Sequence, residues 1–127
     1  MVVKVRLDTV VRPWGSFYIL ETGEGYQVKQ LRVKPESKNS LQYHDHRDEV
    51  WVVVQGYGKA WHDNGFGDIM QETITVGDTI KVYAGFPHRI ENPSPTQDLV
   101  LIEVQLGDPI DEEDIVRVAD DYGRTLN

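Results

Sequence analysis

The chain has 127 residues, a formal net charge of −8 and no cysteine. This length fits one domain with its own hydrophobic core, and the lack of cysteine excludes disulfides, thiolate zinc sites, iron–sulfur clusters and a cysteine nucleophile. The acidic charge argues against nucleic acid and anionic membranes as partners, because both require a basic surface. An anionic ligand is compatible with the sequence only where basic side chains gather locally.

Residues 1–15 contain no apolar run long enough for a signal peptide or a transmembrane helix, because Lys4, Arg6 and Asp8 interrupt the segment. A cytoplasmic location is therefore expected.

Short segments rich in Val, Ile, Tyr, Trp and Thr then follow one another, separated by Gly, Pro, Asn and Asp, which is typical of many short strands. The predicted strands are Val2–Leu7, Ser16–Leu20, Tyr26–Lys34, Ser40–His46, Glu49–Gln55, Lys59–Asp63, Asp68–Thr75, Asp78–Tyr83, His88–Asn92 and Leu99–Leu106. About ten strands in one domain indicate an all-β sandwich or barrel.

Only the C-terminal segment has a helical pattern. Four acidic residues occupy positions 111–114, ahead of Ile115 and Val118, and acidic side chains are favoured in the first turn of a helix. A short helix over about residues 111–118 is therefore predicted. The whole chain, residues 1–127, is expected to form one domain with its core at about residues 12–107.

Three of the four histidines fall in two short segments. Gln42, His44 and His46 stand at alternate positions of a predicted strand, so their side chains can project from one face. Glu49 follows them, and His88 lies in a later Gly- and Pro-containing segment. By itself, a pair of histidines on a strand is more often a hydrogen-bonded surface pair than a metal site.

The two segments together resemble the motifs of the cupin superfamily. The matched positions are Glu49 and Gly56 in the first motif and Gly77, Gly85, His88 and Asn92 in the second, where Tyr83 replaces the usual proline. The resemblance implies a single cupin barrel, an antiparallel double-stranded β-helix of jelly-roll type, that carries one divalent metal ion. It also implies a homodimer, because cupins commonly pair through β-sheet surfaces; the apolar strand Val2–Leu7 could lie in that interface.

The spacing within the first motif decides which residues the resemblance assigns as metal ligands. If His44 and His46 are the histidine pair of the family, only two residues separate them from Glu49, fewer than the motif has. Gln42 in the place of the first histidine restores the spacing, although an ordinary strand-edge amide is the alternative. The implied ligands are then Gln42, His44, Glu49 and His88, a set that suits Zn²⁺, Mn²⁺, Co²⁺, Ni²⁺ or Fe²⁺. His46 is left as a fifth ligand or as an acid–base group.

Over most of its length, from Arg12 to Arg124, the chain also resembles type II phosphomannose isomerase. The segments that carry this similarity include Arg12-Pro-Trp-Gly15, Ser40-Leu-Gln42, His44–Trp51, His88–Asn92, Ile102–Gly107, Asp114–Arg117 and Tyr122-Gly-Arg124. The resemblance implies a metal-dependent isomerase that interconverts mannose 6-phosphate and fructose 6-phosphate. In that family the cupin is often fused to a mannose-1-phosphate guanylyltransferase; this chain is too short for that domain, so guanylyltransferase activity is not expected.

Such an isomerisation needs a Lewis acid for the enediolate and a group that moves one proton between two carbons. Arg47 and Arg89 are the candidates for stabilising the enediolate or the phosphate, although Arg89 follows His88 directly and reaches the same site only if the backbone twists. His46 and Glu103 are the acid–base candidates, with a buried, partnered carboxyl as the alternative for Glu103. Weaker phosphate-binding candidates are Lys29, Arg12 and Lys81.

Three other functions remain open at this level. They are a cupin isomerase for another sugar phosphate, an Fe²⁺ dioxygenase, and a metal-dependent module that binds a sugar or sugar phosphate without turnover. The dioxygenase would leave the similarity of the flanking segments unexplained. The fold alone does not separate the others, because one fold carries many functions.

Overall fold

Twelve β-strands and no helix make up residues 8–123, the part of the chain that the computed structural model describes. The predicted strand Val2–Leu7 and Arg124 lie outside the described residues. The strands are β1 (Val10–Arg12), β2 (Gly15–Gly23), β3 (Tyr26–Val33), β4 (Ser37–Lys38), β5 (Leu41–Tyr43), β6 (Arg47–Gln55), β7 (Tyr57–Asp63), β8 (Ile69–Thr75), β9 (Thr79–Val82), β10 (His88–Asn92), β11 (Leu99–Gly107) and β12 (Val116–Ala119). Residues 8–123 contain no helix long and apolar enough to cross a membrane.

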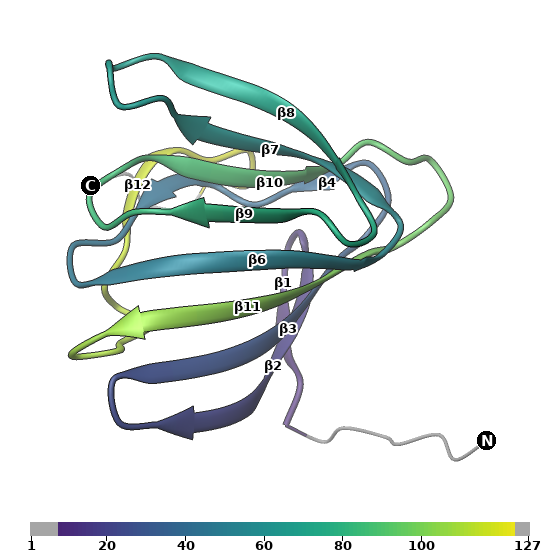
Figure 1. Ribbon diagram of the computed structural model, residues 1–127. Coiled ribbons are helices and arrows are strands. Elements are labelled where there is room, and N and C mark those ends of the chain that lie inside the picture. The colour runs from purple at the N-terminus through teal and green to yellow at the C-terminus, as the bar shows by residue number, and fades with distance from the viewer. Residues whose placement is uncertain (1–7, 124–127) are drawn as a thin grey trace.

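The strands form two antiparallel sheets that face each other (Figure 1). The first has the order β1-β2-β3-β11-β6-β9; the second has the order β12-β5-β10-β7-β8, with β4 paired to β10. The all-β prediction is confirmed. The long neighbours β3, β11 and β6 run through the middle of the first sheet, so their inward side chains form the floor of the interior.

These three strands alternate inward and outward side chains, and the inward side chains change from mainly apolar to mainly polar along each strand. In β11 the inward residues Leu99 and Leu101 are followed by Glu103 and Gln105, and all four are buried. In β3 and β6 the neighbours of Leu101 are Leu31 and Val53, whereas Lys29 and Trp51 flank Glu103, and Gln27 and Glu49 flank Gln105. The interior therefore has an apolar end and a polar end, built by the same strands.

The hydrophobic core includes the buried side chains of the apolar end and extends to the wall of the polar end. Its members include Trp14, Phe17, Leu31, Val33, Val53, Ala60, Ile74, Ile90, Leu99 and Leu101, of which Trp14, Phe17 and Leu31 also line the pocket of the polar end. Burial of this apolar surface is the main force that holds the two sheets together.

The predicted C-terminal helix is wrong. Residues 112–113 form a turn, and Val116–Ala119 pairs with β5 as an antiparallel strand. The carboxylate of Asp114 accepts hydrogen bonds from the backbone N–H groups of Asp45 and His46, at 2.9 and 3.0 Å. This acid caps a distant turn instead of a helix of its own, and the β-branched Val116 and Val118 favour the strand that follows.

The segment predicted as one strand over Ser40–His46 is shorter than expected, because β5 ends at Tyr43 and a bend at Asp45–His46 leads into β6. The bend changes the alternation of side chains. Arg47 is buried on the same inward face as Glu49, whereas His46 is exposed. Gly107 lies opposite, where a Cβ atom would stand 2.1 Å from the His46 carbonyl oxygen, so only glycine fits.

Candidate functional site

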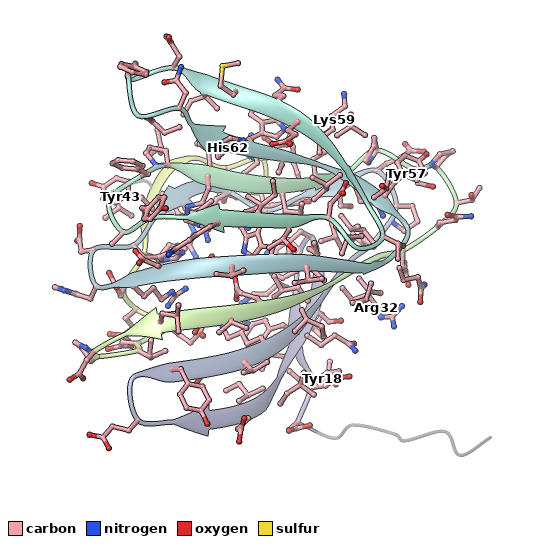
Figure 2. All side chains as sticks on the ribbon, in the orientation of Figure 1. Tyr18, Arg32, Tyr43, Tyr57, Lys59 and His62 are labelled. Carbon is pink, nitrogen blue, oxygen red and sulfur yellow. The ribbon has the colours of Figure 1, made fainter. Side chains whose placement is uncertain are left out.

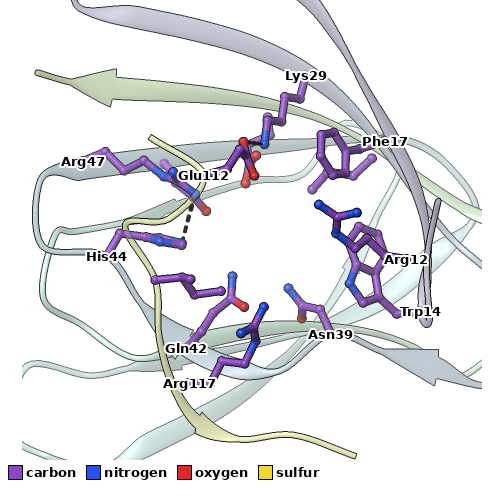
Figure 3. A pocket seen from close by; sticks show the side chains of 14 residues that line it. Arg12, Trp14, Phe17, Lys29, Asn39, Gln42, His44, Arg47, Glu112 and Arg117 are labelled. Carbon is purple, nitrogen blue, oxygen red and sulfur yellow. Dashed lines mark hydrogen bonds and ion pairs between the residues drawn. The ribbon is translucent and has the colours of Figure 1, made fainter. Parts of the chain in front are cut away.

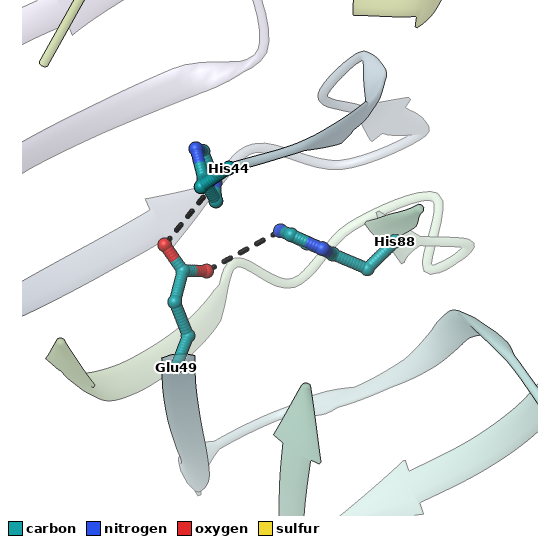
Figure 4. A group of neighbouring side chains, drawn as sticks. All are labelled: His44, Glu49 and His88. Carbon is teal, nitrogen blue, oxygen red and sulfur yellow. Dashed lines mark ion pairs between the residues drawn. The ribbon is translucent and has the colours of Figure 1, made fainter. Parts of the chain in front are cut away.

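Two histidines and one glutamate meet at the polar end of the interior. His44 follows β5, Glu49 lies on β6 and His88 begins β10, and all three are buried. One ligand atom from each lies within 4.8 Å of the others. The Nε2 atoms of His44 and His88 are 3.3 and 3.4 Å from the two carboxylate oxygens of Glu49 (Figure 4). Two imidazole nitrogens and one carboxylate are a donor set for a divalent metal ion.

Backbone carbonyls fix the orientation of both imidazole rings. Nδ1 of His44 lies 2.6 Å from the carbonyl oxygen of Asp114, and Nδ1 of His88 lies 3.0 Å from that of Phe86. Because a carbonyl oxygen only accepts, each Nδ1 carries a proton. Arg47 Nη2 donates to Nε2 of His44 at 3.3 Å, so this nitrogen is an acceptor on the side of the ring that faces Glu49 (Figure 3). Nε2 of His88 is buried without a hydrogen-bond partner among the described residues. A metal ion bound between these rings would supply the missing partner, so the three residues fit a metal.

The charge states of His44 and Glu49 also suit a cation. Burial lowers the pKa of His44 to about 4, aided by Arg47 and His88, so the ring is neutral near pH 7. Burial opposes ionisation of Glu49, but the contacts with His88 and His44 outweigh it and hold its pKa well below the usual range. His44 and Glu49 therefore offer a neutral imidazole and an ionised carboxylate, which are the forms that bind metal.

A second buried carboxyl, Glu103, lies beside the triad, and its pKa is shifted in the opposite direction from that of Glu49. Burial raises its pKa well above the usual range, and the neighbouring Glu49 charge raises it further. Trp51 Nε1 donates to Glu103 at 3.1 Å and to Glu49 at 3.3 Å, and Gln105 donates to the other Glu103 oxygen at 3.1 Å. Glu103 is thus a buried, partnered carboxyl; its part in proton transfer stays a prediction.

Four cationic side chains line the pocket above these carboxyl groups: Arg12, Lys29, Arg47 and Arg117 (Figure 3). Arg47 Nε donates to Glu49 at 2.9 Å and its Nη1 donates to the carbonyl oxygen of Asp111 at 3.0 Å. The Lys29 ammonium is paired with Glu112 and lies 4.2 Å from the centre of the Phe17 ring. The pocket thus places these cationic groups, two of them paired with carboxylates, beside two members of the triad, His44 and Glu49. Cationic groups in a concave site favour an anionic ligand.

Gln42 lines the same pocket from β5, opposite His88 on one side and Arg117 on the other. Its amide oxygen accepts a hydrogen bond from the Ser40 hydroxyl at 2.5 Å. A carbonyl oxygen has two lone pairs, so this bond leaves one free for a metal. The assignment of Gln42 as a ligand stays a prediction.

Three predicted residues lie away from this pocket. Arg89 is buried on the opposite side of β10 from His88, where its Nε donates to the Asn39 carbonyl oxygen and its guanidinium lies 5.2 Å from the Trp61 ring centre. His46 is exposed at the bend after β5, and Lys81 is exposed on β9 with its ammonium 5.0 Å from the Tyr83 ring centre. Regular strand alternation explains the position of Arg89, since the backbone does not twist enough to turn it inward.

Sequence reasoning missed Arg117, Glu112 and Asn39 as pocket residues. Arg117 lies on β12 directly opposite Gln42, so both side chains share one face. The alternation of Val116, Arg117 and Val118 is a strand signal that would have found it, but the acidic run before it was interpreted as the start of a helix. His62, the histidine outside both motifs, lies on β7 with its Nε2 3.3 Å from Glu72 (Figure 2).

The family model described as Mannose-6-phosphate isomerase C-terminal matches residues 3–120. A curated relative from Escherichia coli, named mannose-1-phosphate guanylyltransferase, is 44% identical over 91% of this chain. The xanthan biosynthesis protein XanB of Xanthomonas campestris and the mannose-1-phosphate guanylyltransferase ManC of Salmonella typhimurium are each 41% identical. The chain spans only 23–24% of the length of these relatives.

These relatives overturn the predicted activity. At 41–44% identity two of them are named as guanylyltransferases of mannose 1-phosphate and none of the three as an isomerase. The assignment of this chain as a mannose-6-phosphate isomerase is therefore wrong, and so is its description as a sugar-phosphate isomerase. The sequence resemblance identified the correct family. The description of that family mentions mannose-6-phosphate isomerase, but the names of these relatives do not.

Solved structures support the fold. The capsular polysaccharide assembling protein CapF of Staphylococcus aureus superposes with a TM-score of 0.74 at 25% identity, over 87% of this chain and 34% of CapF. A Klebsiella pneumoniae protein with a double-stranded β-helix domain superposes with a TM-score of 0.67 at 15% identity, over 94% of this chain and 90% of its own. The predicted cupin fold is confirmed.

Proposed function

Because the chain belongs to the Mannose-6-phosphate isomerase C-terminal family, we propose that it is a metal-binding cupin domain that binds a phosphorylated hexose for mannose-1-phosphate guanylyltransfer. The curated relatives supply the ligand class, since their printed names specify mannose 1-phosphate. In this proposal the chain itself binds and positions the sugar phosphate, and the nucleotide chemistry belongs to a separate domain or protein.

One observation carries the proposal: cationic side chains gather around the triad in a chain whose net charge is −8. Lys29 and Arg47 are buried, and burial of a charge is costly unless a partner compensates it. Basic side chains concentrated in one concave site of an acidic protein raise the local concentration of anions and reject cations other than a tightly held metal.

The residues divide into three roles. His44, Glu49 and His88 would hold one divalent metal ion, with Gln42 as the fourth ligand, and the metal would supply a Lewis acid for a hydroxyl or phosphoryl oxygen. Lys29 and Arg12 would bind the phosphoryl group, Arg12 from the exposed rim. Arg47 would orient the Glu49 carboxylate, because its Nε already donates to that group.

Isothermal titration calorimetry of the chain loaded in turn with Zn²⁺, Mn²⁺, Co²⁺ or Ni²⁺ tests the proposal. We expect mannose 1-phosphate to bind at least tenfold more tightly than mannose, and Lys29→Met to remove that preference. Lys81→Met is the matched control, because it removes the same charge from the exposed surface of β9. Equal affinity for mannose and mannose 1-phosphate with every metal would sink the proposal.

A further inference from the structure

The segment between β11 and β12, residues 108–115, is here named the strap. Two anchors hold it against the site. Arg47 donates to the carbonyl oxygen of Asp111, and Asp114 accepts from the backbone N–H groups of Asp45 and His46. The strap residues Glu112 and Ile115 line the pocket. The contacts of Asp111 and Asp114, on either side of Glu112, therefore fix the position of the Glu112 backbone.

The Glu112 carboxylate forms an ion pair with the Lys29 ammonium inside the pocket (Figure 3). The two partners differ in burial: the side chain of Lys29 is 4% exposed and that of Glu112 is 48% exposed. Glu112 can turn into water at little cost. Lys29 cannot, because an ammonium left without a counter-ion in a buried position is strongly destabilised.

We infer that the Glu112 carboxylate is an internal competitor for the ligand: it occupies the anion position at Lys29 until a phosphoryl oxygen of the ligand replaces it. The inference rests on the proposed function, since it states how the same pocket receives the phosphoryl group of a phosphorylated hexose. The exchange keeps Lys29 paired throughout, because one anion enters as the other leaves.

The exchange requires an anionic group on the ligand. A hydroxyl group that displaced Glu112 would leave the buried Lys29 ammonium without a counter-ion, which is costly. A phosphoryl group carries more negative charge than a carboxylate and offers three acceptor oxygens, so Arg12 on the same pocket wall can bind it together with Lys29. Mannose is therefore expected to leave the pair of Glu112 and Lys29 in place, whereas a phosphoryl group displaces the carboxylate.

The test compares Glu112→Gln with Glu113→Gln in the metal-loaded chain, with mannose 1-phosphate, inorganic phosphate and mannose as titrants. Glu113 is exposed on the same strap outside the pocket, so its substitution changes the net charge equally. Without a competing carboxylate, Glu112→Gln is expected to bind both phosphate compounds about tenfold more tightly than the unsubstituted chain. Glu113→Gln should match the unsubstituted chain, and binding of mannose should not change.

The outcomes separate the two proposals. If Glu112→Gln and Glu113→Gln bind both phosphate compounds equally, the inference is overturned, and the proposed function stands as long as the unsubstituted chain prefers mannose 1-phosphate to mannose. If no form binds mannose 1-phosphate but Glu112→Gln gains affinity for inorganic phosphate, the hexose ligand is wrong and the competition at Lys29 is supported. Binding of neither phosphate compound to any form would overturn both.

Discussion

The apolar and polar ends of the barrel interior use the same strands for different purposes. At the apolar end, Leu101 lies between Leu31 and Val53, and nothing but packing relates these side chains. Two residues along β11, Glu103 lies between Lys29 and Trp51. It interacts with Lys29 through charge and accepts a hydrogen bond from Trp51. The comparison indicates that the apolar end contributes most of the stability through packing, whereas the polar end buries titratable groups whose contribution depends on pH.

The largest effect is expected from the apolar end. Leu101→Ala removes a side chain that is fully buried and should lower the free energy of unfolding by about 2–5 kcal/mol. Leu106→Ala, on the same strand but 41% exposed, should change it by about 0.5 kcal/mol or less. Urea denaturation measures both, and metal content measured on the folded variants should be unchanged. Loss of metal from folded Leu101→Ala would show that the two ends are not separable.

The polar end should make stability depend on pH. The folded state lowers the pKa of His44 from 6.5 to about 4, so between these values the unfolded chain binds more protons than the folded one. This contribution to stability is complete above pH 6.5 and is lost as the pH falls toward 4, by about 3 kcal/mol in the metal-free protein. Denaturation at several pH values should show the slope.

Two substitutions test whether His44 causes this dependence of stability on pH. His44→Gln should flatten it in the window between pH 4 and 6.5, and His62→Gln, which removes a partly exposed histidine from β7, is the matched control. An unchanged slope in His44→Gln would show that another group carries the proton uptake.

Metal binding should depend on the polar end alone. His88→Gln removes a nitrogen that points at Glu49 and has no other hydrogen-bond partner among the described residues. It should weaken binding of Co²⁺ or Zn²⁺ about 100-fold or more, since even the loss of residues that only orient metal ligands costs 10–100-fold. Competition with a chelator measures the affinity. His62→Gln is again the control, and equal affinities in the two variants would exclude the triad as the metal site.

The same contrast explains what the sequence could and could not predict. Motif spacing singled out His44, Glu49 and His88, which the structure brings together, because the spacing within each motif is a local signal. The role of Asp114 was not readable, because its hydrogen-bond partners Asp45 and His46 lie about 70 residues earlier. With that long-range contact unseen, the strap was predicted as a helix, and Arg117 on the strand after it was missed.

The smallest predicted effect decides between two ligand assignments at the bend. Gln42 faces the pocket and is the fourth ligand under the spacing argument, whereas His46 is exposed with its backbone held by Asp114. Gln42→Ala should weaken metal binding about tenfold, the loss of one neutral oxygen ligand from four, a free energy of about 1.4 kcal/mol. His46→Ala should leave metal binding within twofold of the unsubstituted chain. If His46→Ala empties the site and Gln42→Ala does not, the two histidines are the family's ligand pair, and the bend that turns His46 outward must rearrange when the metal binds.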